Sequence, residues 1–503
     1  MSRLFVRFHN ITFAYPSAAE PLFRDLSLHL PRGWSGVVGA NGTGKTTLLR
    51  LAAGQLRPDT GTVEMPARAV YCPQRTDDVP DRFGQFAGAQ TKSAWTIREM
   101  LSVEGDWANR WDTLSHGERK RAQIATALWL EPEVLAIDEP TNHLDALARD
   151  LVATSLRSFR GVGLLVSHDR ELLDSLCTQC VFIDPPDVTV RPGGVTKGAE
   201  AARLEQQTAQ RQHDHNKRAY EKVRREAVRR EELARQAQSR RSKRHLAIRD
   251  HDAREKKDRA RVSGKDGVGG KLRRQLRGQL AGAEERSQTT RVKKQHEIGI
   301  WLPGSTSKRN ALLELPAGSL PLGEHRRLAY PDLTIRPTDR IALTGVNGSG
   351  KSTLVRHLLA KLEVSPGQLT YVPQEIDAGR SRQMLDQVRR LAKDRLGHLM
   401  TIVSRLGSRP DRLLASDDPS PGETRKLLLA LGMLGAPHII IMDEPTNHMD
   451  LPSIEALEAA LGDCPCSLLL VSHDRRFLQA LTRTTWHIAA DPDAAEVFTL
   501  DVG

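Results

Sequence analysis

The stretch GANGTGKTT at residues 39–47 returns almost unchanged as GVNGSGKST at residues 345–353. Both copies fit the pattern GxxxxGK[ST], in which glycines let backbone N–H groups face phosphate while the lysine and hydroxyl side chains reach the phosphate oxygens and Mg²⁺. Each copy follows a short aliphatic run and precedes a helix-like segment. The two stretches therefore predict phosphate-binding loops at strand-to-helix junctions of an α/β fold.

Four other motifs recur in the same order, each displaced by 300 or 305 residues. They are YCPQ (71–74) and YVPQ (371–374), LSHGE (114–118) and PSPGE (419–423), DEPTNH (138–143 and 443–448), and LLVSHDR (164–170 and 469–475). Repetition at a nearly constant displacement indicates a duplicated domain. We expect domains at 1–195 and 304–503, joined by an unrepeated insert at 196–303.

Acidic residues end one aliphatic run in each copy, VLAID and IIIMD. A buried strand that ends in Asp-Glu delivers two carboxylates to the sheet edge where the phosphate loop lies. Asp138 and Asp443 suit the Mg²⁺ shell, and Glu139 and Glu444 suit orienting and deprotonating an attacking water. The arrangement predicts nucleotide hydrolysis in both copies.

The LSHGE motif begins with a serine ahead of a helical segment. Ser115 and the amide of Gly117 therefore present a positive helix end to a γ-phosphate. The loop that contains Lys45 already serves the phosphates of its own domain, so this helix end is expected to face a phosphate held by the other domain.

Together these motifs resemble an ATP-binding cassette, which also carries a glutamine after a strand (Gln74, Gln374) and an aspartate after DEPTNH (Asp145, Asp450). The resemblance implies a monomer with two tandem P-loop cassettes in a head-to-tail sandwich and two ATP molecules with Mg²⁺ at the interface. One site would combine Lys45, Asp138, Glu139 and His168 with Ser420 and Gly422; the other would combine Lys351, Asp443, Glu444 and His473 with Ser115 and Gly117.

The implied site residues fall into three groups. The catalytic group is Glu139, Glu444 and the switch histidines His168 and His473. The metal group is Thr46, Gln74, Asp138, Ser352, Gln374 and Asp443. The ATP-binding group is Tyr15, Gly39, Asn41, Gly42, Gly44, Lys45, Thr46, Thr47, Gln74, Ser115 and Gly117, with Gly345, Asn347, Gly348, Gly350, Lys351, Ser352, Thr353, Gln374, Ser420 and Gly422.

The second copy departs from the cassette pattern in two places. Pro419 replaces the usual leucine of the signature, and Pro421 removes an N–H that could face phosphate, although proline is tolerated in a first helical turn. Tyr15 stands where cassettes place an aromatic ring against adenine, whereas the matching stretch at 315–325 has no aromatic residue. We expect unequal ATP sites, with loose base selectivity in the second.

The insert carries the basic charge of the chain. Residues 201–300 contain 29 Lys and Arg and 14 Asp and Glu, a net charge of +15 against +12 for the whole chain, so a polyanionic partner is expected here. Residues 199–263 lack Gly and Pro and consist largely of helix formers, which favours a long helical hairpin. The alternative is a disordered segment of mixed charge.

We expect the hairpin tip within 240–270 and contact with RNA there through phosphate charge and shape, since Tyr220 is the only aromatic residue from 201 to 300. The candidate RNA-binding residues are Arg240, Arg241, Lys243, Arg244, Arg254, Lys256, Lys257, Arg259, Arg261 and Lys265.

Twin cassettes joined by a basic helical linker and carrying DEPTNH resemble the ABC-F family of translation proteins. The resemblance implies binding at the exit-tRNA site of the ribosome when ATP is bound, with the linker directed toward the peptidyl-transferase centre, large-subunit rRNA and the P-site tRNA. Only 41 positions separate Gln74 from Ser115, against 46 between Gln374 and Ser420, so no arm is inserted in the first cassette. This favours the antibiotic-resistance type, which protects ribosomes from large-subunit drugs.

Other classes fit less well. A housekeeping ABC-F translation factor is the first alternative, and the ATPase subunit of a drug exporter is the second. DNA-repair ATPases usually resemble cassettes with a zinc site or an internal coiled coil, and neither pattern is present. No apolar run approaches the ~18–20 residues of a membrane span, and the five cysteines are scattered through apolar contexts, as expected for buried thiols. We expect a cytoplasmic protein that needs neither a membrane nor a stable protein partner.

Overall fold

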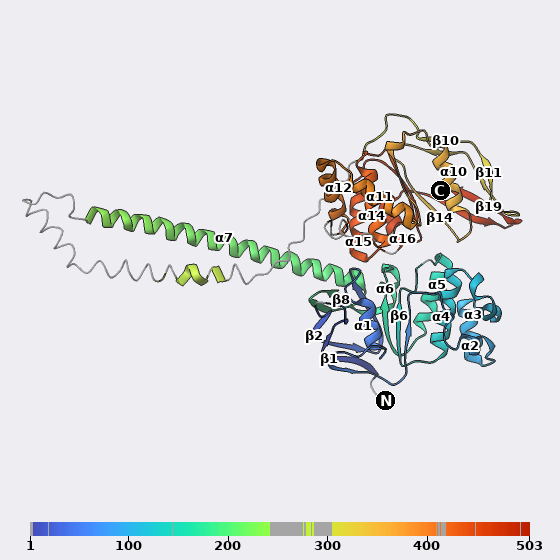
Figure 1. Ribbon diagram of the computed structural model, residues 1–503, viewed down its shortest axis with the longest axis horizontal. Helices are drawn as coiled ribbons and strands as arrows, with labels where there is room; N and C mark the ends of the chain where they lie inside the picture. Colours follow the sequence, from blue (N-terminus) through green and yellow to red (C-terminus); the bar gives the residue numbers. More distant parts are fainter. Residues whose placement is uncertain are drawn as a thin grey trace, which may run out of the picture. The chain divides into compact units, whose positions relative to one another are not determined.

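The computed structural model describes residues 4–18, 20–142, 144–241, 275, 278–282, 284–285, 304–408, 410, 413, 419–447, 449–492 and 494–503. The chain divides into two compact units, one made of residues 1–198 and 298–503 and the other of residues 199–297. Figure 1 shows both cassettes, the first coloured blue to green and the second yellow to red.

The first cassette is built on two sheets (Figure 1). A three-stranded antiparallel sheet has the order β2-β1-β4, and a six-stranded sheet has the order β5-β6-β7-β3-β8-β9, parallel except for its last pair. The strands are β1 (Phe5–Phe13), β2 (Phe23–Pro31), β3 (Gly33–Gly39), β4 (Thr60–Glu64), β5 (Ala69–Cys72), β6 (Val134–Asp138), β7 (Val162–Val166), β8 (Cys177–Asp184) and β9 (Asp187–Pro192).

The helices of the first cassette connect these strands. They are α1 (Lys45–Ala52), α2 (Phe83–Gly88), α3 (Lys92–Leu101), α4 (His116–Trp129), α5 (Ala146–Arg157) and α6 (Arg170–Leu176), with short 3₁₀ turns at Gly105–Asn109 and Trp111–Thr113. The parallel strands β6 and β7 are buried along their whole length, which explains their uninterrupted aliphatic sequences.

The second cassette repeats this plan with one larger sheet. Its eight strands have the order β11-β12-β19-β18-β14-β17-β16-β15, and β10 and β13 form a separate pair. The strands are β10 (Leu313–Leu315), β11 (Gly318–Pro321), β12 (Arg327–Tyr330), β13 (Leu333–Ile335), β14 (Arg340–Gly345), β15 (Leu369–Val372), β16 (Ile439–Asp443), β17 (Ser467–Val471), β18 (Thr484–Asp491) and β19 (Ala494–Val502). The helices are α10 (Lys351–Lys361), α11 (Ala378–Arg389), α12 (Lys393–Arg405), α14 (Pro421–Met433), α15 (Leu451–Gly462) and α16 (Arg475–Leu481), with a 3₁₀ turn at Pro366–Gln368.

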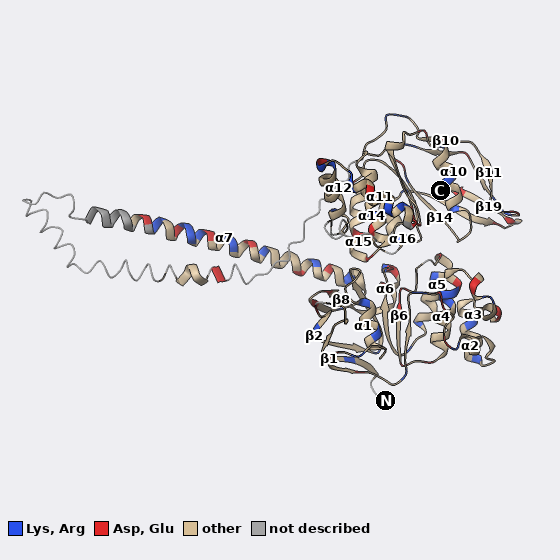
Figure 2. Ribbon diagram, in the orientation of Figure 1, with Lys and Arg blue, Asp and Glu red and all other residues tan. Residues whose placement is uncertain are grey.

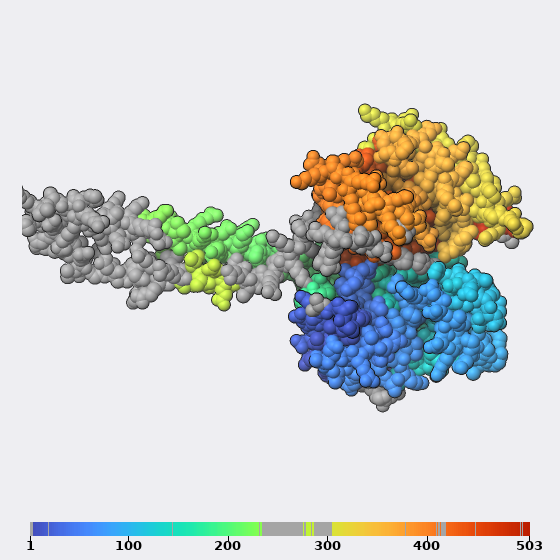
Figure 3. All heavy atoms as spheres, in the orientation of Figure 1, coloured from blue at the N-terminus to red at the C-terminus, as the bar shows by residue number. Residues whose placement is uncertain are grey.

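The two cassettes are in contact within their unit. Leu451 at the start of α15 is buried in the hydrophobic cluster of the first cassette, beside residues such as Trp34 and Leu173. Arg170 of α6 makes an ion pair with Glu458 of α15. The space-filling view in Figure 3 shows the first cassette, in blue, against the second, in yellow to orange. These contacts join α15 of the second cassette to α6 and the hydrophobic cluster of the first.

The insert begins with one long helix, α7 (Val195–Arg241), of 47 residues. At 1.5 Å per residue such a helix is about 70 Å long. None of residues 199–230 is buried, and this helix carries 13 Lys and Arg against 7 Asp and Glu. Figure 2 shows both signs of charge along its described length. The expected first leg is therefore present as helix. The returning leg is described only at 275, 278–282 and 284–285, where it is helical, and the expected tip lies mostly outside the described residues.

All five cysteines are buried free thiols, as their apolar contexts predict. Within the described part of the chain, no cluster of His, Cys, Asp and Glu could hold a metal ion on its own. No helix among the described residues is both long enough and apolar enough to cross a lipid bilayer.

Candidate nucleotide sites

Both phosphate loops place a lysine at the first position of a helix. Gly44 and Gly350 precede the helices with φ near +99° and +98°, a left-handed conformation that glycine adopts without a steric penalty. The ammonium of Lys45 donates to the carbonyls of Gly39 (2.8 Å) and Ala40 (3.0 Å), and Lys351 donates to Gly345 and Val346 at the same distances. Burial lowers the pKa of both lysines. The repeated loops thus have the same geometry.

A hydroxyl and a carboxylate meet beside each loop. Thr46 Oγ1 donates to Asp138 Oδ2 at 2.6 Å, and Ser352 Oγ donates to Asp443 Oδ2 at 2.7 Å. These hard oxygen donors, at the start of a helix and the end of a buried strand, fit the ligand preference of Mg²⁺. The structure thus brings Thr46 to Asp138 and Ser352 to Asp443, and the role of these residues as Mg²⁺ ligands stays a prediction.

The glutamates that follow these aspartates have unusual backbones. Glu139 and Glu444 both have φ near +48°, which is uncommon for a residue with a side chain. Their amides donate to the carbonyls of Val166 (2.9 Å) and Val471 (2.8 Å), which holds each glutamate against the neighbouring strand. The two strand ends therefore turn each carboxylate inward at a cost in backbone strain.

Burial raises the pKa of both glutamates and lowers the pKa of His473. It raises the pKa of Glu139 and, with smaller opposing effects of Arg149 and Lys351, raises the pKa of Glu444 to about 7. Nε2 of His168 lies 3.0 Å from Glu139, and Nε2 of His473 lies 3.5 Å from Glu444. Burial, reinforced by Lys351 and Arg149, lowers the pKa of His473 to about 3, so this imidazole is neutral at pH 7.

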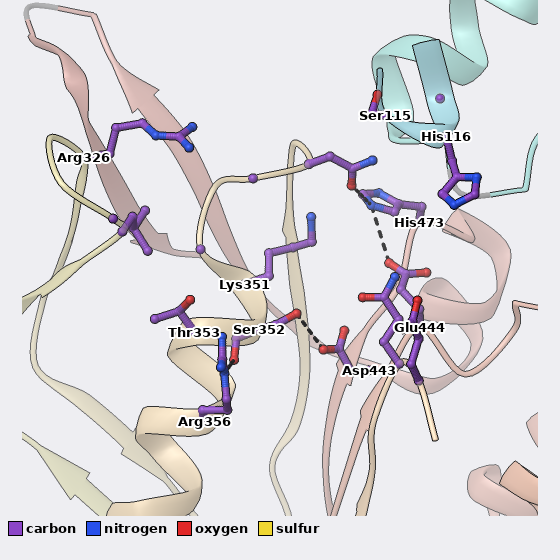
Figure 4. A pocket seen from close by; sticks show the side chains of 18 of the residues that line it. Ser115, His116, Arg326, Lys351, Ser352, Thr353, Arg356, Asp443, Glu444 and His473 are labelled. Carbon is purple, nitrogen blue, oxygen red and sulfur yellow. Dashed lines mark hydrogen bonds and ion pairs between the residues drawn. The ribbon is translucent and has the colours of Figure 1, made fainter. Parts of the chain in front are cut away.

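One cavity of about 950 Å³ joins residues of both cassettes. Lys351, Ser352, Asp443, Glu444 and His473 of the second cassette share it with the helix start of α4. Figure 4 shows Ser115 and His116 facing the side of the cavity that holds His473. The full lining set also includes Gly117, Asn347, Gly348, Gly350, Thr353 and Gln374. The structure thus brings together the residues predicted for one of the two shared sites.

Reciprocal hydrogen bonds link each phosphate loop to the other cassette. The amide of Asn41 donates to Asp450 Oδ2 at 2.8 Å, and the amide of Asn347 donates to Asp145 Oδ2 at 3.3 Å. Both aspartates also cap helices, since Asp145 accepts from Ala148 and Asp450 accepts from Ser453. These paired contacts match a head-to-tail arrangement of the cassettes.

Both signature serines cap helices through a reciprocal pair of bonds. Ser115 accepts from the amide of Glu118, whose carboxylate accepts from the serine amide, and Ser420 and Glu423 repeat this pattern. Pro421 occupies the first turn of α14, where a helix needs no N–H from it. Ser420 and Gly422 do not line the 950 Å³ cavity. Their predicted role opposite Lys45 therefore stays a prediction.

Comparison with known proteins supports the cassette assignment. The family model described as ABC transporter matches residues 23–142 and again 328–447. The chain is 30% identical to the ATP-binding protein Uup of Caulobacter vibrioides, over 96% of this chain and 76% of that protein. This chain belongs to the ABC-F family of ATP-binding cassette ATPases.

Two further similarities extend over nearly the whole chain. The ABC-F chain is 25% identical to the ribosome protection protein VmlR of Bacillus subtilis, over 94% of this chain and 84% of that protein. A solved complex of the archaeal ribosomal stalk protein aP1 and the ribosome recycling factor aABCE1 matches with a TM-score of 0.63 and 18% identity, covering 98% of this chain and 89% of that one. The structural match shows a shared fold.

Tyr15 and Gln74 both match positions of the ABC-F cassette pattern. In this structure the two residues have different surroundings. Tyr15 is 38% exposed, and its hydroxyl lies 2.9 Å from Thr47 Oγ1 at the start of α1. Gln74 lines a smaller cavity of about 290 Å³ together with Glu139. Tyr15 thus lies beside the first phosphate loop, whereas Gln74 lies next to the candidate base.

Several residues at the sites of this ABC-F chain were not predicted from the sequence. Arg149, Arg326 and Arg356 all line the large cavity. Lys120 and Arg425 are buried cations that donate to main-chain carbonyls behind the sites: Lys120 to Pro73 and Asp138, Arg425 to Gln374 and Asn447.

The sequence does carry a signal for Lys120 and Arg425. Both are basic, and each lies five positions after the serine of its signature motif. Arg149 and Arg326 have no basic counterpart at the matching position of the other copy, so the repeat could not reveal them.

Two of the candidate RNA-binding residues lie in the part of the chain that the structure describes, and eight do not. Arg240 and Arg241 belong to the last turn of α7. The other eight candidates, from Lys243 to Lys265, lie outside the described residues.

Proposed function

We propose that this ABC-F protein is a cytoplasmic, ribosome-associated ATPase that protects the large ribosomal subunit from antibiotics. The observation that carries the proposal is α7, a helix of 47 residues with a clear excess of Lys and Arg, in which none of residues 199–230 is buried. Such a helix has no apolar face to bury and suits a polyanionic surface. The similarity to the ribosome protection protein VmlR supports the ribosome as the partner, and its rRNA would offer such a surface.

In the proposed cycle, ATP held by Lys351 meets the signature helix of the other cassette through Ser115 and Gly117, and the reciprocal site uses Lys45 with Ser420 and Gly422. Glu444 and Glu139 orient and deprotonate the attacking water, and His473 and His168 contact the γ-phosphate. Mg²⁺ would be held by Thr46, Gln74 and Asp138 in one site and by Ser352, Gln374 and Asp443 in the other, where it would offset phosphate charge.

One observation at the second site supports a water molecule, which can donate hydrogen bonds, as the missing neighbour of Glu444. Both of its carboxylate oxygens are buried and lack a hydrogen-bond partner among the described residues. A buried polar atom without a partner is costly. A bound nucleophile beside the γ-phosphate would remove that cost.

We further propose domain limits of 1–195, 196–303 and 304–503, with the linker tip within 240–270. The bound protein would occupy the exit-tRNA site and direct its linker toward the peptidyl-transferase centre and the P-site tRNA. Phosphate contacts by the basic residues from Arg240 to Lys265 would supply most of the affinity.

Ribosome sedimentation tests the first part of this proposal. The doubly substituted Glu139→Gln/Glu444→Gln protein binds ATP but hydrolyses it slowly, so it should pellet with ribosomes in ATP and much less in ADP. Recovery with membranes instead would support an exporter ATPase. Equal pelleting in both nucleotides would contradict ATP-gated binding.

A charge variant of α7 separates linker contacts from cassette contacts. Arg224, Arg225, Arg229 and Arg230 are exposed on α7, so replacing all four with glutamine should preserve the helix. The variant should bind ribosomes more weakly, with a shallower dependence on salt, by up to about 0.7–0.9 in log–log slope per lost phosphate contact. The matched control replaces four exposed acids of α7 or the cassettes, for which binding should not weaken.

Drug susceptibility tests the antibiotic-resistance assignment against the housekeeping alternative. A sensitive host expressing the wild-type protein should tolerate more of at least one large-subunit inhibitor, and the double Glu→Gln variant should not confer that tolerance. If no inhibitor in a broad panel shows a shift while ribosome binding persists, the protein acts as a general ABC-F translation factor.

A further inference from the structure

Two cysteines of the second cassette lie side by side in one turn. Cys464 and Cys466 flank Pro465 between the end of α15 and the start of β17, and their Sγ atoms are 2.7 Å apart. Both thiols are free, and each residue is 1% exposed. Pro465 is exposed, so the pair lies just beneath the surface. Neither cysteine lines the 950 Å³ cavity, and the nucleotide sites therefore do not account for the pair.

The turn that carries the two thiols is held from two sides. The guanidinium of Arg340 donates to the carbonyls of Leu461 (2.9 Å) and Cys464 (2.5 Å), which joins the end of α15 to the turn. On the other side, a Cβ on Gly304 would lie 2.8 Å from the sulfur of Cys464 and 3.5 Å from that of Cys466. The backbone at Gly304 thus covers both sulfurs. These contacts keep the two thiols together.

The surroundings of the pair favour a thiolate on Cys464. The hydrogen bond between the two thiols lowers the pKa of Cys464, burial opposes this shift, and the Cys466 amide and the charge of Arg340 reinforce it. The same hydrogen bond raises the pKa of Cys466, which therefore keeps its proton. Because the thiolate is the nucleophilic form of cysteine, the turn combines a nucleophile with a second thiol in direct contact.

A second close pair, Cys177 and Cys180 of β8, has different surroundings. A Cβ on Gly36 would lie 2.9 Å from the sulfur of Cys180 and 3.3 Å from that of Cys177, so both sulfurs pack against β3. The hydrogen bond with Cys180, burial and the charge of Asp174 all raise the pKa of Cys177. A thiol that keeps its proton is a poor nucleophile. This pair is therefore an internal control for the first.

We infer that Cys464 and Cys466 form a redox-active dithiol, which a hydroperoxide closes to a disulfide and small thiols reopen. The Cys464 thiolate attacks the terminal oxygen of the hydroperoxide, so that an S–O bond forms, the O–O bond breaks and the leaving alkoxide takes up a proton. The sulfur of Cys466 then attacks the resulting sulfenic acid; the S–S bond forms, the S–O bond breaks, and hydroxide leaves as water with the Cys466 proton. The two cysteines together lose two electrons, and the hydroperoxide gains them.

The geometry makes closure of the pair easy. A disulfide bond is about 2.05 Å long, so sulfurs that are now 2.7 Å apart need to approach by only about 0.7 Å. Two small thiols reverse the step by exchange and leave as their own disulfide. In a reducing cytoplasm the closed form would be transient, as it is for redox-sensing cysteines. The inference goes beyond the proposed function and does not rest on it.

Thiol counting on the full-length protein tests the inference without any substitution. The reduced protein is exposed to hydrogen peroxide and then unfolded, and its remaining thiols are labelled with N-ethylmaleimide for mass spectrometry. Two of the five thiols should be lost, with two hydrogen atoms missing only from the peptide that contains residues 464–466, and dithiothreitol should restore both. The pair should oxidise at least tenfold faster than Cys177 and Cys180. Retention of all five thiols, or earlier oxidation of Cys177 and Cys180, would overturn the inference.

Single substitutions assign the two roles within the pair. Cys466→Ser leaves the attacking thiol without a partner, so dimedone should trap a sulfenic acid on Cys464. Cys464→Ser should give at least tenfold less trapped product. Cys177→Ser is the matched control, because it removes a buried thiol from the other pair and should leave oxidation of residues 464 and 466 unchanged.

Thermal unfolding of each variant shows whether the fold is kept, and the thiol count on the wild type stands without them. Equal trapping of sulfenic acid in folded Cys466→Ser and Cys464→Ser proteins would contradict the role of Cys464 as the nucleophile. These assays contain neither ATP nor ribosomes, so their failure would leave the proposed ribosomal function standing.

Discussion

The amide of Asn41 in the first phosphate loop donates a hydrogen bond of 2.8 Å to Asp450, a residue of the other cassette and 409 positions away in the chain. One oxygen of Asp450 serves this contact, while the other accepts from the amide of Ser453 and caps α15. Burial alone would raise the pKa of Asp450, but the hydrogen bonds from Ser453 and Asn41 and the nearby Lys426 lower it. An ionised carboxylate thus ties the start of α15 to the loop that is expected to hold ATP.

Replacing Asp450 with serine should separate its two roles, which are to cap α15 and to accept the hydrogen bond from Asn41. Serine caps helices as well as aspartate does, but its single hydroxyl is too short to serve Asn41 as well. Asp450→Ser should keep an unfolding midpoint close to the wild type and lower ATP hydrolysis by about tenfold, the loss expected for one charge-assisted hydrogen bond. Asp450→Ala should show the same loss of hydrolysis and about 1 kcal/mol less stability. If both variants hydrolyse ATP at the wild-type rate, the contact has no part in assembling the site.

Glu444 should make the stability of the nucleotide-free protein depend on pH. Its pKa is raised from an ordinary 4.5 to about 7, so between these values the folded protein binds a proton that the unfolded chain has lost. Stability therefore falls as pH rises from about 4.5 to 7 and then levels, because both states are ionised above the folded pKa. Glu444→Gln should be more stable than the wild type by about 1–3 kcal/mol at pH 8 and nearly equal at pH 4.5. Unfolding in urea across this range measures the difference, and a constant difference at all pH values would refute the shift.

Arg149 should support hydrolysis at one site only. Its guanidinium donates to the carbonyl of His473 at 2.9 Å, across the two cassettes, and the matching position of the second cassette is the buried Ile454. Arg149→Ala should slow hydrolysis about tenfold in a Lys45→Ala protein, because the switch histidine loses a charged donor. The same substitution in a Lys351→Ala protein should have little effect.

The control for Arg149 is an exposed arginine at the last turn of the same helix, Arg157. Arg157→Ala should leave hydrolysis unchanged in both single-site proteins. Equal losses at both sites after Arg149→Ala would mean that the substitution disturbs α5 as a whole.

A cluster of three residues joins α16 to the first turn of α7. Arg476 donates to Asp174 at 2.7 Å and to Thr196 Oγ1 at 2.6 Å, and the amide of Thr196 donates to Asp174 at 2.9 Å. The ion pair is partly exposed, with side-chain exposures of 37% and 21%. A double-mutant cycle with Arg476→Ala and Asp174→Ala should give a coupling of about 0.5–1.5 kcal/mol that falls in high salt. Additive losses of stability would show that the pair does not hold α16 to α6 beside the start of the linker.

The parts of the site that the repeated motifs specify could be predicted from the sequence. The geometry of the loop lysines and of the hydroxyl–carboxylate pairs follows from residues that occur in both copies, because the same spacing folds in the same way. The sharing of one cavity by Ser115 and Lys351 was expected from the resemblance to a cassette. Aliphatic runs such as VLAID predicted strands that are in fact buried along their length. The general α/β plan and the tandem cassettes could be predicted for the same reason.

Other features depend on tertiary contacts that leave no local pattern. Arg149 and Arg326 matter because helices and hairpins from distant segments bring them to one cavity, and their neighbours in the sequence resemble ordinary surface segments. The high pKa of Glu444 comes from burial within the assembled site, which a motif alone does not reveal. Residues 242–270 of the window predicted for the linker tip lie outside the described residues, so the window of 240–270 stays a prediction.

The most direct test of ATP-gated binding of the linker to ribosomal RNA is a cryo-electron microscopy structure of ribosomes incubated with the Glu139→Gln/Glu444→Gln protein and ATP. We expect closed cassettes at the exit-tRNA site, nucleotide between Lys351 and Ser115, and the basic linker against large-subunit rRNA near the peptidyl-transferase centre. Ribosomes without bound protein, or cassettes bound with the linker directed away from RNA, would contradict this mechanism.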